Sequence, residues 1–202
     1  MSHSPQRHYP SASFLTSCAR LADLPPAQGP EVAFAGRSNA GKSSTLNRVC
    51  QRRALAHVSK TPGRTQLINF FALREGGCLV DLPGYGYAKV PEAERRRWQG
   101  LIEGYLTRRE ALRGLVIVMD IRHPLTAQDR QLLDWCAWRG LPAHVLLNKA
   151  DKLKRGRMSA TLQQVRKALA ADYEGVTVQH FSASTGAGLD ALYARLDAWL
   201  AE

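Results

Sequence analysis

A lysine and a serine follow a glycine-rich loop in the segment GRSNAGKSS, residues 36–44. Gly36, Gly41, Lys42 and Ser43 match the pattern G-x-x-x-x-G-K-[ST]. Glycines let the backbone approach an anion and turn several N–H groups toward it. The segment therefore predicts a phosphate-binding loop, with Lys42 on the β- and γ-phosphates and Ser43 on Mg²⁺. The alternative is an ordinary tight turn between a strand and a helix.

A carboxylate and a glycine come next, in the segment VDLPGYG. Asp81 and Gly84 form the pattern D-x-x-G at the end of an apolar run. An aspartate there can hold Mg²⁺ through water, and the Gly84 N–H can sense a γ-phosphate. Turns of the Asp-Pro-Gly kind are common, so the pattern alone is weak. Its place downstream of Lys42 favours the nucleotide interpretation.

Two further segments predict a pocket for a base. In LLNKAD, the Asp151 carboxylate can accept hydrogen bonds from the N1–H and N2–H₂ groups of guanine, whereas adenine lacks both donors and would leave it unpaired. Lys149 can lie along the base and support the loop. In FSAS, residues 181–184, small side chains allow a backbone N–H, that of Ala183, to meet the guanine carbonyl.

The segment VSKTPGRTQLINFF, between Lys42 and Asp81, has the Gly, Pro and basic residues of a mobile loop. Thr65 is our choice for the threonine that closes on Mg²⁺ when a γ-phosphate is present. Thr61 is the alternative, and spacing alone does not decide between them. No arginine finger is evident, although Arg64 lies in this loop.

The elements that must position these residues alternate along the chain. We predict strands over 31–36, 66–73, 77–83, 114–121, 143–149 and 177–183, and helices over 42–51, 92–110, 126–139, 157–171 and 188–201. This order predicts an α/β fold, a six-stranded, mostly parallel sheet with helices on both faces. The second and third strands are joined by REG, which is too short for a parallel crossover, so that pair is antiparallel. Ligands of such sheets bind beyond the carboxyl ends of the strands, where the motifs fall.

Residues 1–29 are rich in Pro, Ser and Gly and predict a partly ordered N-terminal arm, followed by one domain over 30–202. The N-terminus lacks the continuous apolar region of a secretory signal, and no run approaches the roughly 18 apolar residues of a membrane span. A cytoplasmic protein without a membrane partner is expected. Four scattered cysteines without a CxxC pair predict reduced, buried or half-buried thiols and no zinc site.

The net charge of +11 is the informative feature of the composition. Basic clusters occur at 95–97, 108–109 and 152–157, more than one nucleotide needs. They predict a polyanionic partner such as RNA. Tyr85, Tyr87 and Trp98 lie beside the first cluster and could stack on bases. The alternative is that Trp98, like the other tryptophans, packs a helix onto the sheet; helical apolar spacing favours packing for Trp135 and Trp199.

Taken in order, these motifs resemble those of the translation-factor-related P-loop GTPases. The segments GRSNAGKSS, TPGRTQLINFF, DLPGYGYAKV and LNKADKL are similar to those of the EngB (YihA/YsxC) family of ribosome-biogenesis GTPases, within the TrmE-Era-EngA-EngB-septin-like group, over about residues 14–200. The resemblance implies a single three-layer, Ras-like GTPase domain. It also implies a role in assembly of the large ribosomal subunit, needed for normal growth and cell division, with GTP binding regulating association with a precursor particle.

The resemblance assigns roles to individual residues. It makes Thr65 the switch I threonine, and it implies slow hydrolysis, because Tyr85 stands where Ras-like enzymes have a glutamine that orients water. It also makes Asn39 a candidate K⁺ ligand beside the phosphates; the alternative is that Asn39 caps a turn. Lys42, Thr65 and Gly84 are the expected catalytic residues, and the metal ligands are Ser43, Thr65 and, through water, Asp81. The predicted GTP-binding set is Gly36, Arg37, Ser38, Asn39, Ala40, Gly41, Lys42, Ser43, Ser44, Gly63, Arg64, Thr65, Asp81, Leu82, Pro83, Gly84, Asn148, Lys149, Ala150, Asp151, Phe181, Ser182, Ala183 and Ser184.

The leading hypothesis is thus a monomeric GTP-operated switch on the large ribosomal subunit or its precursor. A metabolic P-loop kinase or ATPase is the first alternative, and NKAD and the absence of a lid or second-substrate domain argue against it. A switch acting on a non-ribosomal protein partner in cell division is the second. That function would require a large exposed apolar patch rather than a basic one.

Overall fold

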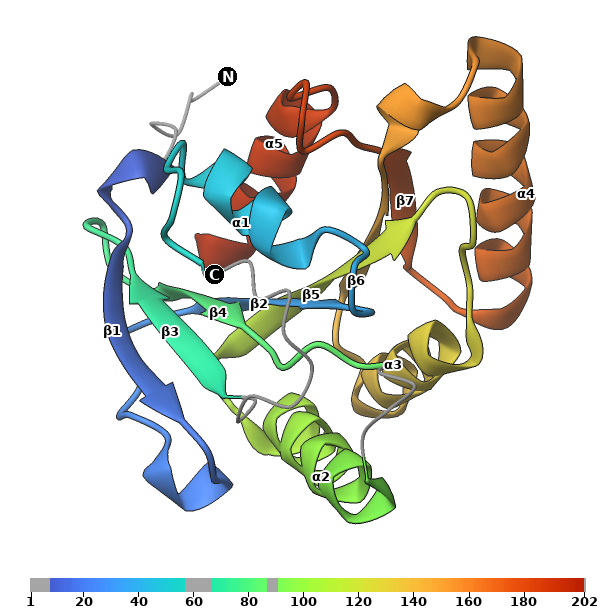
Figure 1. Ribbon diagram of the computed structural model, residues 1–202. Helices are drawn as coiled ribbons and strands as arrows, with labels where there is room; N and C mark the ends of the chain where they lie inside the picture. Colours follow the sequence, from blue (N-terminus) through green and yellow to red (C-terminus); the bar gives the residue numbers. More distant parts are fainter. Residues whose placement is uncertain (1–7, 57–66, 87–90, 202) are drawn as a thin grey trace.

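The computed structural model describes residues 8–56, 67–86 and 91–201, and in them the chain forms one twisted sheet covered by helices (Figure 1). The strands are β1 (Ser13–Cys18), β2 (Glu31–Gly36), β3 (Ile68–Ala72), β4 (Cys78–Asp81), β5 (Leu112–Asp120), β6 (Ala143–Asn148) and β7 (Thr177–His180). The helices are α1 (Lys42–Val49), α2 (Glu92–Arg108), α3 (Ala127–Arg139), α4 (Arg155–Asp172) and α5 (Leu189–Leu200), with 3-10 turns at Tyr9–Ser11, Leu21–Asp23 and Ala150–Lys152. The α/β fold class predicted from the sequence is confirmed.

The strand order is β1-β3-β4-β2-β5-β6-β7, so the sheet has seven strands where the sequence predicted six. The additional strand, β1, comes from the segment predicted to be an arm, and it pairs antiparallel with β3. β3 also runs antiparallel to β4, while β2, β4, β5, β6 and β7 are mutually parallel, as predicted. The division of the chain at residue 29 stays a prediction.

Alternation along β2 shows how the two faces of the sheet are covered. Val32 and Phe34 pack with apolar residues of α1 and α5, whereas Ala33 and Ala35 pack on the other face with residues of α2, α3 and α4. All four side chains are fully buried. A strand that is apolar on both sides needs a helical layer on each face, and Figure 1 shows those layers above and below the sheet.

The structure corrects the expectations for two tryptophans. Trp98 of α2 is only 5% exposed, so it packs in the protein interior and is not a base-stacking surface. Trp138 of α3 is 77% exposed and does not pack a helix onto the sheet. Trp199 is a buried residue of α5, and Trp135 is half-buried against the core, both as predicted. The four cysteines are free and buried, which confirms the prediction of buried thiols.

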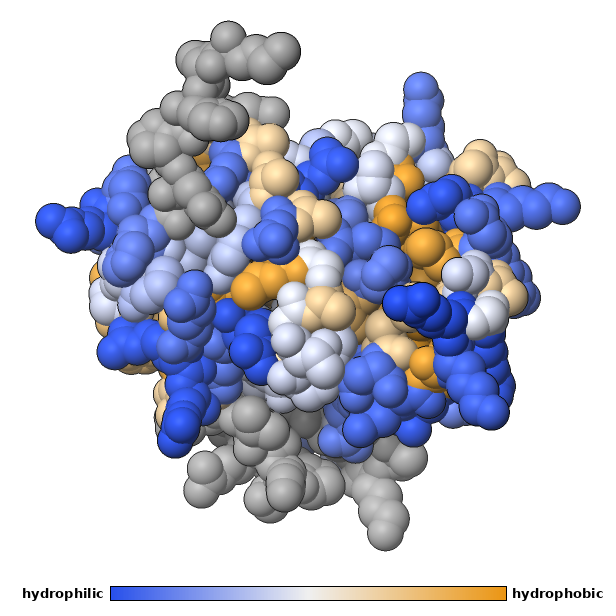
Figure 2. Space-filling model, turned by 90° about the horizontal axis from the view of Figure 1, so that it is seen from above, coloured by the Kyte–Doolittle hydropathy of each residue, from blue (hydrophilic) through white to orange (hydrophobic). Residues whose placement is uncertain are grey.

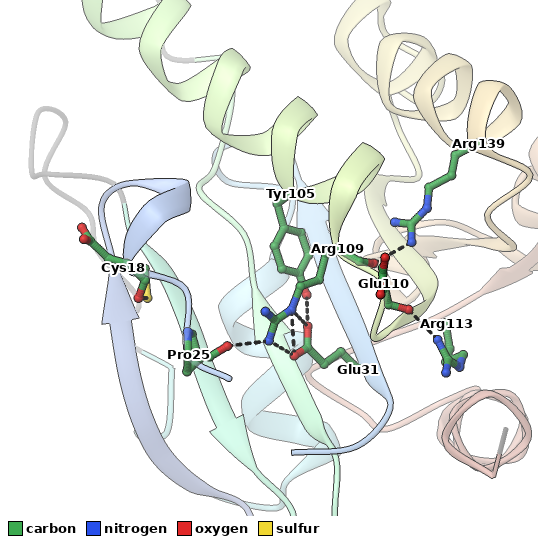
Figure 3. A network of polar contacts seen from close by, with 9 residues as sticks. Cys18, Pro25, Glu31, Tyr105, Arg109, Glu110, Arg113 and Arg139 are labelled. Atoms are coloured by element: carbon green, nitrogen blue, oxygen red, sulfur yellow. Dashed lines mark hydrogen bonds and ion pairs between the residues drawn. The ribbon is translucent and has the colours of Figure 1, made fainter. Parts of the chain in front are cut away.

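A buried ion pair holds the end of β2 that lies away from the phosphate loop (Figure 3). Glu31, the first residue of β2, is 1% exposed, and its carboxylate accepts hydrogen bonds from the Arg109 guanidinium and, at 2.7 Å, from the Tyr105 hydroxyl. Arg109 also donates to the Pro25 carbonyl at 2.9 Å. The network therefore joins the N-terminal segment, the strand that leads to the phosphate loop and the end of α2.

Replacing Arg109 with methionine should leave the Glu31 carboxylate buried without its cation. We expect a loss of about 3 kcal/mol in the free energy of unfolding, measured by urea denaturation. Arg113→Met is the matched control, because Arg113 donates to the Glu110 carbonyl at the surface, and its loss should be under about 1 kcal/mol. Equal losses in the two variants would contradict a structural role for the buried pair.

Candidate nucleotide-binding site

The phosphate loop connects β2 to α1, and two separate constraints exclude a side chain at Gly41. Gly41 caps α1 in the left-handed conformation, with φ of 97°. A Cβ atom built there would lie 2.3 Å from the Asn148 side-chain nitrogen. Both the backbone angle and the approach of Asn148 thus exclude a side chain, and the N-terminal end of α1 is left open toward an anion.

Asn148, at the end of β6, joins the phosphate loop to residues 181–184, which we call the base loop. Its Nδ2 donates to the Ala40 carbonyl at 2.8 Å, and its Oδ1 accepts from the Ala183 N–H at 3.1 Å. Asn148 is 2% exposed, so the pairing leaves its buried amide satisfied. The Ala183 N–H that the sequence assigned to the guanine carbonyl therefore already has a partner, and a base would have to share or replace it.

Lys149 supports the same loop from the next position along the chain. Its backbone is left-handed, with φ of 65°, a conformation that lysine rarely adopts and that marks functional loops. Its Nζ donates to the Asn39 carbonyl at 2.5 Å and contacts the Asp120 carboxylate at 3.0 Å. Burial alone would raise the pKa of Asp120, but hydrogen bonds from Arg122 and Lys149 hold it well below its usual range. Asp120 is thus a fixed anion that orients Lys149.

The groups predicted to bind phosphate and metal lie side by side. The Lys42 ammonium contacts the buried Asp81 carboxylate at the end of β4. Ser43 is the second residue of α1, next to Lys42 and half-buried. A cation, a hydroxyl, a carboxylate and a helix N-terminus are the donor set that a nucleotide phosphate with Mg²⁺ requires, so these residues fit both groups.

Asp151 lies at the rim of the site, within the 3-10 turn that follows β6. Its carboxylate accepts a hydrogen bond from the buried Ser182 hydroxyl at 2.6 Å, and this bond lowers the pKa of Asp151. The side chain, which is 19% exposed, is therefore an anion at neutral pH, and the hydrogen bond from Ser182 fixes its position. An oriented carboxylate of this kind accepts from two adjacent N–H donors, which guanine offers.

The remaining predicted residues divide between those that the structure describes and those that it does not. Leu82 and Pro83 are buried behind Asp81, Gly84 is half-buried, and the Leu82 N–H donates to the Phe34 carbonyl at 3.0 Å. Arg37, Ser44 and Ser184 are exposed, and Ala150 and Phe181 are buried. Thr61, Gly63, Arg64, Thr65 and Tyr87 lie outside the described residues.

Arg48 supports this site although the sequence patterns did not indicate it. Arg48, in the last turn of α1, donates to the Ala183 carbonyl at 2.7 Å and to the Ser184 carbonyl at 2.6 Å. It therefore fixes the base loop from the same helix that begins at Lys42. Its partners are backbone atoms 135 and 136 residues away in the chain, so no side-chain pattern could have indicated the contact.

Comparison with known proteins agrees with this geometry. The family model for the 50S ribosome-binding GTPase matches residues 31–149, and that for the elongation factor Tu GTP-binding domain matches residues 105–202. A probable GTP-binding protein EngB of Aromatoleum aromaticum is 56% identical over 190 residues, covering 94% of this chain and 88% of the relative. A protein of the same name from Coxiella burnetii is 52% identical over 191 residues, covering 95% and 93%.

Solved structures share the fold. That of a probable GTP-binding protein engB superimposes with a TM-score of 0.66 at 20% identity, covering 84% of this chain and 98% of its own. That of Era in complex with MgGDPNP and nucleotides 1506–1542 of 16S ribosomal RNA has a TM-score of 0.63 at 18% identity, covering 88% and 58%. The three-layer P-loop GTPase architecture predicted from the sequence is confirmed.

Arg48→Met should free the base loop while leaving the phosphate loop in place. We expect the Kd for GDP, measured by calorimetry, to rise roughly tenfold, because two charge-assisted hydrogen bonds to the loop are lost. Arg52→Met is the matched control: Arg52 follows the same helix and donates to the Ala12 carbonyl at 2.7 Å, away from the base loop. A GDP affinity that is unchanged in Arg48→Met, or lowered equally in both variants, would contradict this role.

Proposed function

The chain belongs to the EngB family of GTP-binding P-loop GTPases, and from that premise we propose that it is a nucleotide switch in assembly of the large ribosomal subunit. Binding and hydrolysis of GTP follow from the family. The observation that carries the ribosomal part is the match of residues 31–149, which include the phosphate loop and Asp81, to the 50S ribosome-binding GTPases. The protein would act in the cytoplasm as a monomer, and its role would extend to normal growth and cell division.

In this proposal individual residues have specific roles. Lys42 binds the β- and γ-phosphates, Ser43 ligates Mg²⁺, and Asp81 holds the ion through water. Thr65 and the Gly84 N–H respond to the γ-phosphate and order the switch segments. The contact between Lys42 and Asp81 supports this assignment, because it keeps the phosphate-binding cation next to the metal-binding carboxylate.

Base selection would depend on Asp151, with Asn148 and Lys149 holding the surrounding loops. The hydrogen bond from Ser182 supports that role, since it fixes the Asp151 carboxylate in its ionised form. GTP is then preferred over ATP because adenine presents no pair of donors to the carboxylate.

Hydrolysis is expected to be slow without a partner. Tyr85 replaces the water-orienting glutamine, and its hydroxyl donates to Asp129 of α3 at 2.6 Å, which engages it away from any attacking water. Asn39 is the candidate K⁺ ligand, and a K⁺ ion would supply a fixed positive charge beside the phosphates. Equal turnover in K⁺ and Na⁺ would exclude that ion.

A basic, exposed rim supports a ribosomal RNA partner. Arg95, Arg96 and Arg97 are exposed in the first turns of α2, which follows β4. Lys152, Lys154, Arg155 and Arg157 are exposed where α4 begins, after β6. Both clusters follow the carboxyl ends of strands, so they flank the nucleotide site and would bind phosphates of an RNA by charge and shape. The fold relative Era, whose structure contains 16S ribosomal RNA, supports this partner class.

The surface gives less support to the alternative, a switch on a non-ribosomal protein in cell division. Hydrophilic side chains cover most of the face seen in Figure 2, and apolar ones are exposed in smaller areas between them. An extended apolar patch, the usual mark of a protein-docking surface, is not the dominant feature of that face. No helix in the described part of the chain is long and apolar enough to cross a membrane.

Sedimentation with ribosomal subunits tests the proposal. We expect the purified protein to pellet with the large subunit or its precursor in the presence of a non-hydrolysable GTP analogue, less with GDP, and less at higher salt. The variant Arg95→Glu/Arg97→Glu should sediment less, and Arg74→Glu, an exposed arginine in the β3–β4 turn, is its control. Tight guanine-nucleotide binding without sedimentation in any state would contradict the ribosomal role and favour a protein partner.

Asp151→Asn tests the base assignment separately. An asparagine amide can donate to the 2-carbonyl of xanthine but cannot accept from both donors of guanine. GDP affinity should fall by at least about a hundredfold, and xanthosine diphosphate should become the preferred ligand in a competition assay. Asp172→Asn, at the far end of α4, should leave the preference unchanged. If Asp151→Asn still prefers guanine nucleotides, another residue must recognise the base.

A further inference from the structure

Tyr85 is held by its side chain to a helix that carries none of the predicted nucleotide ligands. Its hydroxyl donates to Asp129 Oδ1 at 2.6 Å, 44 residues away in the chain. The half-buried ring also packs against the core on the side of α2 and α3. Burial and the neighbouring Asp129 carboxylate raise the pKa of Tyr85 well above its usual value, so the phenol stays protonated and donates.

Asp129 is a buried hydrogen-bond acceptor and not a surface group. It is 2% exposed and stands at the third position of α3, in a capping box with Thr126. Its Oδ2 accepts from the Thr126 N–H and hydroxyl, both at 2.9 Å, while its Oδ1 faces Tyr85. A buried carboxylate needs donors on both oxygens, and Tyr85 supplies the donor for the second.

The backbone of the same residue is fixed to the phosphate loop. The Tyr85 carbonyl accepts from the Ser38 N–H at 2.7 Å, and Arg37 and Tyr85 form an isolated parallel bridge. At Gly86, with φ of 81°, a Cβ atom would lie 2.8 Å from the Arg37 side chain. The peptide that follows Gly84 is therefore placed between the phosphate loop on one side and α3 on the other.

We propose that Tyr85 and Asp129 are positioning residues for γ-phosphate recognition, because their hydrogen bond holds the backbone at Gly84 in place against the phosphate loop. This inference rests on the proposed role of the Gly84 N–H as the γ-phosphate sensor. GDP has no γ-phosphate, so the pair acts on the difference between GTP and GDP rather than on nucleotide binding in general. Its effect is preorganisation: a tethered N–H loses less conformational freedom when the phosphate binds.

Tyr85→Phe removes the hydroxyl and keeps the ring. The Kd for a non-hydrolysable GTP analogue should rise about three- to tenfold, while the Kd for GDP should change less than about twofold. Tyr173→Phe is the matched control. The Tyr173 hydroxyl also donates to a carboxylate of α3, that of Asp134, at 2.8 Å. Tyr173 itself follows the end of α4. This control variant should leave the ratio of the two Kd values at the wild-type level, even where it lowers thermal stability.

Asp129→Asn and the double variant complete the cycle. If the two residues act as one unit, the double variant should show the same ratio as Tyr85→Phe, because the second change removes nothing further. A ratio of the two Kd values that is unchanged in Tyr85→Phe would overturn the inference. Additive effects of the two single changes in the double variant would overturn it as well.

Gly84→Ala in the same assay separates this inference from the proposed function. If Gly84→Ala weakens analogue binding and Tyr85→Phe does not, the γ-phosphate sensor stands and the positioning pair is wrong. If Gly84→Ala leaves the analogue-to-GDP ratio unchanged, the sensor assignment itself fails, and the inference fails with it. Loss of selectivity in both variants supports the two together.

Discussion

The rest of the site depends on two hydrogen bonds of the Asn148 side chain. One amide, buried at the end of β6, donates to the phosphate loop at Ala40 and accepts from the base loop at Ala183. An amide can do both because it carries a donor and an acceptor in one plane, which neither aspartate nor leucine offers. These two hydrogen bonds fix the position of the phosphate loop relative to the base loop. Gly41 lacks a side chain because Asn148 occupies that space.

Helix α1 makes the same connection a second time, with charge in place of an amide. It begins at Lys42 in the phosphate loop and ends near Arg48, whose guanidinium holds two carbonyls of the base loop. One short helix therefore contacts both loops. The buried strand β2 leads into the phosphate loop from which the helix begins. The Glu31–Arg109 ion pair holds the opposite end of that strand. Contacts thus run from the first residue of β2 to both loops of the site.

The sequence predicted most of this architecture, because alternating apolar runs and glycine motifs are local signals. The strands over β2 to β7 and the five helices were found with ends shifted by a few residues. β1 was missed, since SFLTSC mixes polar and apolar residues and its partner residues in β3 lie 50 to 59 positions away in the chain. Arg48 and Asp129 were missed for a related reason: their partners are distant in the chain, and packing, not spacing, brings them together.

Tyr85 shows what changes when an aromatic residue replaces a water-orienting glutamine. A glutamine amide is free to reach the attacking water, whereas this phenol is engaged by a buried carboxylate and its ring is packed. In the proposed mechanism, the side chain would position the backbone at Gly84 and take no part in the chemistry. In the proposed mechanism, stabilising the charge of the transition state would then fall to Lys42, to Mg²⁺, and to a cation or partner that completes the site. Such a division suits a protein whose hydrolysis should wait for a correctly assembled partner, because the partner can supply the missing group.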